Sequence, residues 1–230
     1  IAGGNAGMAF VPLVLVAFLE KLSLHALPLL ILPAALVGVL FARSGLCSVT
    51  SLPEQQTAEH APLARVLFAR ATITLNLAMG LRCWTHGAFG TFLPLLLVGS
   101  GADTSTAGLF LTIFMVGGMI GGLVGGNLAD VLSGRRIIVG ALLLGILPSA
   151  YYFTHVSADV LGGAVLFAAG FMLMAPQPSS IIWAQQALPE NAGMASGMML
   201  GMSFGLGSLG VAATAALGDH IGLAPALLVS

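Results

Sequence analysis

The sequence predicts an all-α integral membrane protein, a helix bundle with about eight transmembrane helices, the last of them truncated. Of its 230 residues, 58% are hydrophobic and only 7% are charged, whereas a soluble domain carries roughly 25% charged residues. Its apolar segments approach or exceed the roughly 20 helical residues that cross a bilayer. Because the backbone must satisfy its own hydrogen bonds in hydrocarbon, and because short alternating segments are missing, we predict helices and not a β-barrel.

Eight apolar segments follow one another along the chain, and we expect each to be helical. They cover roughly 4–19, 23–42, 67–98, 107–129, 136–154, 159–187, 193–217 and 223–230. Segments 67–98 and 159–187 are longer than a simple span, and their prolines predict kinks because proline lacks an amide donor and crowds the preceding turn. In particular, we predict a bend near Pro176–Pro178.

The polar connection 43–66 sets the expected orientation of the bundle. Alternation of the helices gives its side of the membrane five bases, and gives the other side only Lys21; the five are Arg43, Arg65, Arg70, Arg135 and Arg136. The positive-inside rule therefore makes loop 43–66 cytoplasmic, in a multi-pass protein of the cell inner (plasma) membrane. The chain opens at Ile1 without an initiator Met or signal-peptide pattern and stops in an apolar run. We therefore expect a fragment of a longer protein.

Composition and motifs exclude several function classes. The net charge of −1 gives no reason to expect a nucleic-acid partner. Cys47 and Cys83 lie far apart in different settings, so neither a disulfide nor a metal site is predicted, and no cofactor is expected. No H-E-x-x-H motif, paired-aspartate pattern or G-x-S-x-G elbow occurs, and we therefore do not expect an enzyme.

A short charged turn, "GGNLADVLSGRR" at 125–136, separates two apolar runs. The preceding glycines recur every four residues in two rows: Gly117, Gly121 and Gly125, and Gly118, Gly122 and Gly126. They give segment 107–129 a smooth face that a neighbouring helix can approach closely. We expect the glycine and methionine run 193–210 to serve close helix packing as well. Arg135 and Arg136 open the next helix, where they can also act as simple membrane-side anchors.

This charged turn resembles the G-x-L-A-D-R-x-G-R-R signature of the major facilitator superfamily. The matching residues are Gly126, Leu128, Ala129, Asp130, Gly134, Arg135 and Arg136. The copy departs from the signature at Val131, where a base is expected, and by one extra residue before Gly134. The resemblance implies a conformational gate motif made of Gly126, Asp130, Gly134, Arg135 and Arg136. In such a gate, Asp130 would latch onto the free amides of a helix start near residues 3–6, with Arg135 holding its rotamer.

A narrower resemblance is carried by "RCWTHGAFGTFLPLLL", "PSSIIWAQQALPENAGMASGMMLGMSFGLGSLG" and "GGNAGMAFVP", which look like segments of the superfamily's fosmidomycin-resistance branch. It implies that 1–42 are the last two helices of the N-terminal half, 43–66 the central cytoplasmic loop, and 67–230 the truncated six-helix C-terminal half. It also implies a monomeric secondary active transporter, an antiporter that expels a small, anionic drug or metabolite by proton-coupled alternating access. The alternative is an uptake permease for a small organic anion, because fold does not fix direction.

Arg82 is the first candidate substrate-binding residue. It lies about 14 residues into segment 67–98, roughly 20 Å along the helix and near the membrane midplane, where transporter sites lie. A charge there costs at least ~2.5 kcal/mol unless it faces a partner or a wet cavity, so we predict that Arg82 faces the bundle interior. A guanidinium can fork onto a phosphonate or a carboxylate. The alternative is a structural tie to helix carbonyls or to an acid elsewhere.

His86 and Gln177 complete the candidate substrate-binding set. His86 follows Arg82 by four residues on the same helix face, and it can titrate near neutral pH or act as a packing residue. Gln177 follows Pro176, which frees a carbonyl, so it can satisfy that carbonyl or line a cavity. No Asp or Glu lies deep in any of the apolar segments, and we therefore expect a proton-coupling carboxylate outside this chain.

Overall fold

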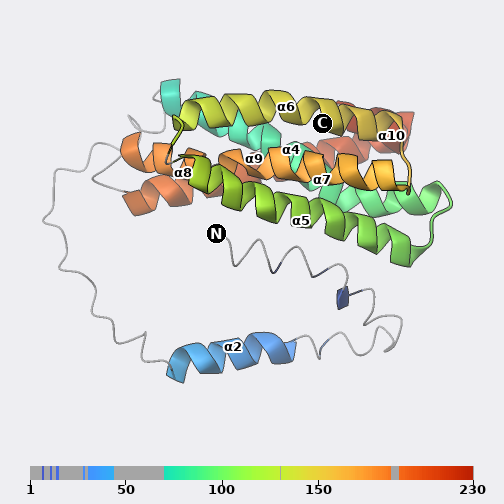
Figure 1. The fold of residues 1–230 in the computed structure, drawn as a ribbon, viewed down its shortest axis with the longest axis horizontal. Coiled ribbons are helices and arrows are strands. Elements are labelled where there is room, and N and C mark those ends of the chain that lie inside the picture. Colours follow the sequence, from blue (N-terminus) through green and yellow to red (C-terminus); the bar gives the residue numbers. More distant parts are fainter. Residues whose placement is uncertain are drawn as a thin grey trace, which may run out of the picture.

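The computed structural model describes residues 31–43, 70–129, 131–187 and 192–229, together with the single positions 7, 11, 14, 15 and 28. In this described part the regular elements are helices (Figure 1). They are α2 (Ile31–Arg43), α4 (Arg70–Gly99), α5 (Thr104–Ala129), α6 (Gly134–Thr154), α7 (Val160–Met174), α8 (Pro176–Ala187), α9 (Ala192–Ile221) and α10 (Leu223–Leu227). The predicted all-α architecture is confirmed. Most of the predicted helix 4–19 and the connection 44–66 lie outside the described residues.

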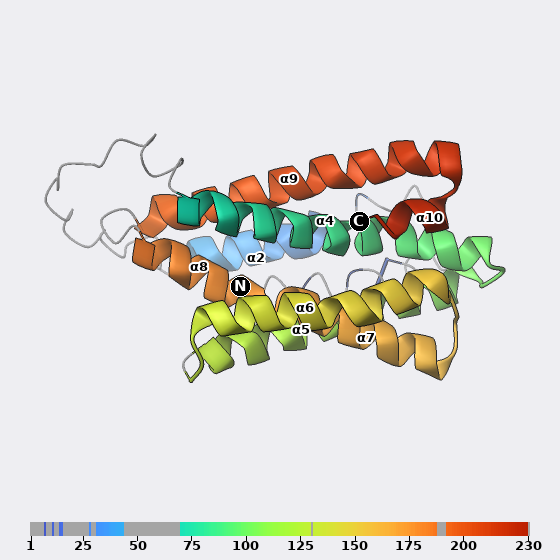
Figure 2. The same cartoon turned by 90° about the horizontal axis from the view of Figure 1, so that it is seen from above.

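Helices α4 to α9 form an antiparallel bundle. Helices α4, α6 and α9 begin at one end of it, where α5 and α8 end (Figure 2). The first turns of α4 and α6 carry the bases Arg70, Arg135 and Arg136 at this end. The acids Asp103, Asp159 and Asp219 lie instead before α5, before α7 and in the last turn of α9, at the opposite end. In the described chain, the bases named above thus lie at one end of the bundle and the acids at the other. This is the charge difference from which the positive-inside rule predicts the orientation.

Four stretches of the described chain are long and apolar enough to cross a membrane. They are Thr104–Ala129, Gly134–Thr154, Val160–Gln186 and Ala192–Ile221. On helix α6, for example, the side chains of Val139, Leu144 and Leu147 remain 48–70% exposed. A surface so rich in large aliphatic side chains fits hydrocarbon and not water.

Helices α5 and α7 pack with almost no side-chain layer between them. Gly117, Gly121 and Gly125 lie against the backbone of the facing segment, at the carbonyl groups of Phe167, Phe171 and Ala175 respectively. A β-carbon at any of the three glycines would overlap that backbone. The smooth face predicted from the glycine spacing is therefore the face that packs, and it draws α5 and α7 into the closest approach that such small residues allow.

Helices α4 and α9 form the second close pair. Gly207 and Gly210 of α9 lie directly against α4. A β-carbon added at Gly207 would overlap Cys83, and one added at Gly210 would overlap Trp84. The Trp84 indole Nε1–H donates to the Thr214 hydroxyl at 2.8 Å, across the same interface. Among the described residues, packing partners are present for only part of the run 193–210. Four of its glycines have no described atom within 4 Å of an added β-carbon: Gly193, Gly197, Gly201 and Gly205.

We expect the Trp84–Thr214 hydrogen bond to contribute measurably to the free energy of unfolding, because it joins α4 to α9. Trp84→Phe keeps an aromatic side chain but removes the Nε1–H donor and one of the two fused rings, while the Thr214 hydroxyl still donates to the Gly210 carbonyl. We expect a loss of about 1 kcal/mol, the usual net value of one hydrogen bond. Thermal unfolding in detergent measures it, with Trp183→Phe as the control, since Trp183 is 38% exposed. Equal melting temperatures for the two variants would contradict the assignment.

The long apolar segment 159–187 is interrupted in its middle. Helix α7 ends at Met174, Ala175 stands between the helices, and α8 begins at Pro176. Pro176 and Pro178 bring no amide hydrogens, so the carbonyls one turn earlier lose their usual donors. Ala175 itself keeps helical backbone angles, with φ −55° and ψ −36°, and the predicted bend near Pro176–Pro178 stays a prediction. Helix α4, by contrast, continues through Pro94.

Asp159 caps the start of α7. Its Oδ1 accepts the Gly162 amide hydrogen at 2.7 Å and the Ser157 hydroxyl at 2.9 Å. These hydrogen bonds hold the pKa of Asp159 below its ordinary value of 3.8, the Gly162 bond contributing most. A carboxyl whose pKa is depressed in the folded state stabilises that state above its ordinary pKa, and the stabilisation is lost as pH falls through the folded-state pKa.

Because of this cap, we expect the stability difference between the wild type and Asp159→Ala to depend on pH. Asp159→Ala is expected to lower the melting temperature at neutral pH, and the difference from the wild type should shrink below pH 3.8. Asp159→Asn should retain most of the cap, because Asn is an equally good N-cap residue. Melting curves at a series of pH values test this. A difference that persists unchanged at the lowest pH would show that Asp159 acts by something other than its charge.

Candidate functional site

The guanidinium of Arg82 lies inside the bundle, as the sequence analysis predicts. Arg82 is only 4% exposed, and it reaches from α4 to the end of α7. Its Nη1 donates to the Leu173 carbonyl at 2.9 Å and to the Met174 sulfur at 3.2 Å, and its Nη2 donates to the Cys83 sulfur at 3.0 Å. Leu173 and Met174 are the last two residues before the helix interruption, so Arg82 ties α4 to the point where α7 ends.

The partners of Arg82 are neutral and mostly weak. Two of its three acceptors are sulfur atoms, which are weak hydrogen-bond acceptors. Its Nε has no partner within the described ranges. The acids of the described chain, Asp103, Asp159 and Asp219, lie at helix ends and not beside Arg82. The result is a buried cation with spare hydrogen-bonding capacity and no described counter-charge.

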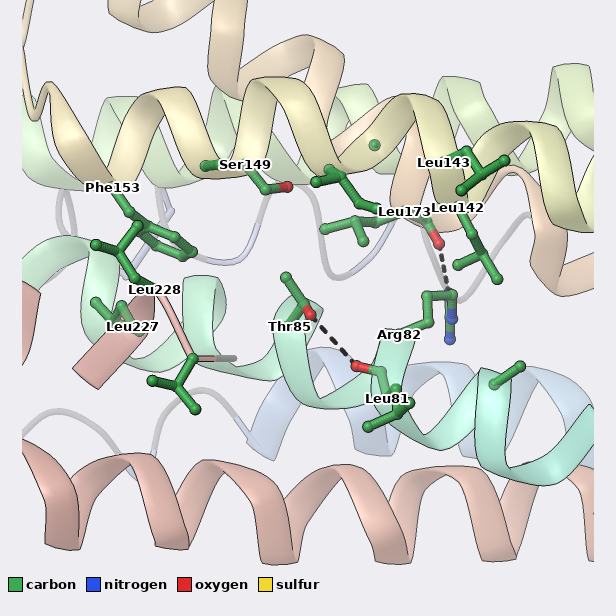
Figure 3. A pocket seen from close by; sticks show the side chains of 15 residues that line it. Leu81, Arg82, Thr85, Leu142, Leu143, Ser149, Phe153, Leu173, Leu227 and Leu228 are labelled. Carbon is green, nitrogen blue, oxygen red and sulfur yellow. Dashed lines mark hydrogen bonds between the residues drawn. The ribbon is translucent and has the colours of Figure 1, made fainter. Parts of the chain in front are cut away.

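A cavity of about 470 Å³ borders Arg82 on one side, between α4, α6, α7 and α10 (Figure 3). Its polar lining residues are Arg82, Thr85 and Ser149, and aliphatic side chains dominate the rest. Figure 3 shows that Arg82 is directed to the Leu173 carbonyl and the Thr85 hydroxyl to the Leu81 carbonyl of its own helix. The Ser149 Oγ, also on this wall, has no hydrogen-bond partner among the described residues.

A second, much smaller cavity of about 10 Å³ borders Arg82 between α4, α8 and α9. Its polar lining residues are Arg82, Gln177, Ser180 and Ser203. The Ser180 hydroxyl donates to the Gln177 backbone carbonyl at 2.7 Å, and the side-chain Oε1 of Gln177 has no partner among the described residues. The structure thus brings two of the three predicted substrate-binding residues, Arg82 and Gln177, to one cavity.

His86 lies elsewhere, although it follows Arg82 by one turn. Its ring packs against Phe114 of α5, with the ring centroids 5.2 Å apart. Phe114 in turn stacks on Phe89 at 4.8 Å, and Phe89 on Phe153 at 4.3 Å. His86 ends this row of rings, and it lines neither cavity beside Arg82. Its contacts are those of the packing alternative.

Comparison with known proteins identifies the family. The family model of the Major Facilitator Superfamily matches residues 1–212. The chain belongs to the major facilitator superfamily. It is 30% identical over 236 residues to an uncharacterized MFS-type transporter, YfnC, of Bacillus subtilis (strain 168), which covers 98% of this chain and 57% of that protein. It therefore spans little more than half the length of this relative.

The resemblance to the fosmidomycin-resistance branch is also confirmed. The chain is 31% identical over 87 residues to the fosmidomycin resistance protein of Escherichia coli (strain K12), which covers 38% of this chain and 21% of that protein. As a member of the major facilitator superfamily with several membrane-capable helices, the chain is a multi-pass membrane protein.

The superfamily signature lies at the α5–α6 turn. Gly126 faces Pro178, and Gly134 begins α6 beside Ser179. Arg135 and Arg136 are exposed in the first turn of α6. Asp130 and the helix start near residues 3–6 lie outside the described residues, so the latch between them stays a prediction.

Sequence reasoning did not select Ser203 or Cys83. Ser203 sits in the glycine and methionine run of α9, yet it is 4% exposed and lines the small cavity. Its selection could have rested on its position, since Ser203 is a polar residue one helical turn after Met199 in a strongly apolar segment. Cys83 has no sequence signal for its role as an acceptor, because that role depends on the conformation of the adjacent Arg82.

Proposed function

We propose that this chain is part of a proton-coupled exporter of a small anionic drug or metabolite, working by alternating access as a monomer without a cofactor. The observation that carries the proposal is the buried guanidinium of Arg82, which has neutral partners and an unpartnered Nε within the described chain. The known similarity to a fosmidomycin resistance protein supports efflux as the direction.

An anionic substrate accounts for the environment of Arg82. A cation in a membrane interior is stabilised by a counter-charge or by water. A carbonyl and two sulfur atoms supply neither, whereas the oxygens of an anionic ligand would form short, charge-assisted hydrogen bonds with the guanidinium. Gln177 shares the small cavity and adds a neutral polar contact. We propose that His86 packs α4 against Phe114 of α5 and does not contact the substrate.

The proposed organisation follows the two-half plan of the superfamily. Residues 1–42 supply the last two helices of the N-terminal half, 43–66 the central cytoplasmic loop, and 67–230 the C-terminal half. The end of the bundle that carries Arg70, Arg135 and Arg136 then faces the cytoplasm, with the protein in the inner (plasma) membrane. Gly126, Asp130, Gly134, Arg135 and Arg136 form the gate there, which closes when Asp130 reaches the start of a helix in the other half.

Protons are the proposed coupling ion, and their carrier lies elsewhere. The acids described here stand at helix ends, and Asp103 and Asp159 already accept hydrogen bonds from neighbouring residues. A carboxylate that binds a proton during the transport cycle needs a buried or cavity-lining position. We therefore assign coupling to helices outside the described chain, and substrate contact to α4, α8 and α9.

Drug susceptibility tests the proposed direction. Expression of the complete protein in a fosmidomycin-sensitive bacterium is expected to raise the inhibitory fosmidomycin concentration several-fold over an empty vector. An uptake permease for a small organic anion would instead lower it, because more drug would enter the cell. Unchanged susceptibility at confirmed membrane expression would contradict efflux of this drug and direct the search to other small anions.

A further inference from the structure

The α7–α8 junction, residues 173–179, is bound by Arg82 at its first two residues. Arg82 Nη1 donates to the Leu173 carbonyl at 2.9 Å (Figure 3) and to the Met174 sulfur at 3.2 Å. Met174 also lies against α5, since a β-carbon added at Gly118 would come within 3.0 Å of its side chain. A change in the hydrogen bonds of Arg82 therefore acts directly on the start of the junction.

The other end of the junction contacts the turn that carries the superfamily signature. A β-carbon added at Gly126 would lie 3.7 Å from the Pro178 ring, and one added at Gly134 would lie 3.6 Å from Ser179. Ser179 is only 2% exposed, and α8 packs against both α5 and α6. The α5–α6 turn thus lies against residues that come little more than one helical turn after those bound by Arg82.

Two prolines make the junction easier to displace than a regular stretch of helix. Pro176 and Pro178 have no amide hydrogens, so they give no helical hydrogen bond to the carbonyls of Met172 and Met174. Prolines of this kind are the usual positions at which a helix changes direction. The part of α7 before the junction is instead in direct backbone contact with α5. We therefore expect the junction, and not the body of α7, to respond when Arg82 changes partners.

We propose that the α7–α8 junction connects the anion site to the gate, and that Pro178 is the positioning residue that moves the α5–α6 turn. This inference rests on the proposed function, in which Arg82 binds an anion and the turn forms the gate. A charge-assisted hydrogen bond from the guanidinium to an anion is roughly twice as strong as one to a neutral carbonyl. The bound anion therefore takes Arg82 Nη1 from the Leu173 carbonyl, and the junction loses its link to α4.

The direction of the effect follows from export. An exporter takes its substrate from the cytoplasm and closes that side before it opens the other. The anion must therefore favour the closed gate, and a ligand shifts such an equilibrium only by interacting differently with the two states. The hydrogen bond from Arg82 to Leu173 supplies the difference, because it exists only while the anion site is empty and the gate is open. By linkage, closure of the gate raises the affinity for the anion by the same factor.

Val131 provides a position from which the gate can be observed. It follows Asp130 in the sequence, and its side chain is 83% exposed. Val131→Cys introduces a thiol that a maleimide reaches less readily when the gate closes over the turn. In the complete protein in detergent, saturating fosmidomycin should slow this labelling at least about fivefold, a usual size for coupling between two sites. The same protein without Val131→Cys gives the background from the native cysteines.

Pro178→Ala in the Val131→Cys protein tests the role of the junction. It removes the ring that faces Gly126 and returns an amide donor to the Met174 carbonyl. The labelling response to saturating fosmidomycin should fall below twofold. The calorimetric affinity should fall by no more than about fivefold, the coupling factor that is lost. Pro94→Ala is the matched control and should keep the full response, since it also removes a proline from a membrane helix, near the end of α4 remote from the gate.

The outcomes distinguish this inference from the function on which it rests. A full response in Pro178→Ala would overturn the role of the junction and leave the anion site and the gate in place. Binding of fosmidomycin to the Val131→Cys protein without slower labelling would overturn the coupling itself. A melting temperature of Pro178→Ala far below that of Pro94→Ala, with binding lost as well, would reduce Pro178 to a structural role. Absence of fosmidomycin binding in the wild type would instead remove the proposed function, and this inference with it.

Discussion

Arg82→Ala is expected to lower the affinity for an anionic substrate at least about 30-fold and to abolish export. Truncating one partner of a buried charge pair costs about 2–5 kcal/mol, and each 1.4 kcal/mol is tenfold in affinity. Arg82→Lys should recover only part of the loss, because an ammonium keeps the charge but not the planar fork of donors. Titration with methylphosphonate and the fosmidomycin susceptibility of expressing cells measure the two effects.

The variant should still fold, which makes the loss interpretable. Removal of the buried charge relieves its desolvation cost, and this offsets the loss of the hydrogen bond to the Leu173 carbonyl. Arg70→Ala is the control, since it removes the same charge from an exposed position on the same helix. If Arg82→Ala transported as well as Arg70→Ala, the guanidinium would be a structural tie between α4 and α7 and nothing more.

Gly121→Ala is expected to reduce the folded, membrane-inserted protein severely. Overpacking typically costs 1–3 kcal/mol, and here the added methyl group would meet the backbone carbonyl of Phe171, which cannot rotate away as a side chain would. Helices α5 and α7 would have to separate along a face that Gly117 and Gly125 also form. The melting temperature and the monodisperse yield after detergent extraction measure the effect.

Gly140→Ala is the matched control for this substitution. Gly140 lies within α6, and an added β-carbon there has no described atom within 4 Å. Alanine is the better helix former by about 1 kcal/mol, so stability should hold or rise. Comparable losses for both substitutions would mean that glycine flexibility matters at these positions and that close α5–α7 contact does not.

The helical spans could be predicted from the sequence because their signals are local. The apolar segments 107–129 and 136–154 match α5 (Thr104–Ala129) and α6 (Gly134–Thr154) to within a few residues at each end. The glycine period predicted which face of α5 packs, and the paired prolines lie at the point where α7 ends and α8 begins. In each case the spacing of residues along one helix carries the information.

The site could be predicted only in part, because its contacts join distant segments. Charge in an apolar run was enough to select Arg82 and to predict that it faces inward. Its main acceptor, the Leu173 carbonyl, lies 91 residues further along the chain, and a backbone carbonyl carries no residue-type signal. Ser203 could not be selected either, because it lines the cavity with Arg82 and Gln177 only once the bundle has brought their helices together. His86 shares the helix face of Arg82, yet its ring packs against Phe114 and lines neither cavity.

Flux of labelled fosmidomycin into proteoliposomes tests the central claim most directly. An antiporter exchanges luminal protons for external substrate, so the complete protein should accumulate the drug when the lumen is acidic and not when the external medium is acidic. Arg82→Ala should abolish this accumulation, and Arg70→Ala should preserve it. Accumulation driven by an acidic exterior would identify an uptake symporter, and undiminished flux through Arg82→Ala would contradict the assignment of Arg82 as the anion-binding residue.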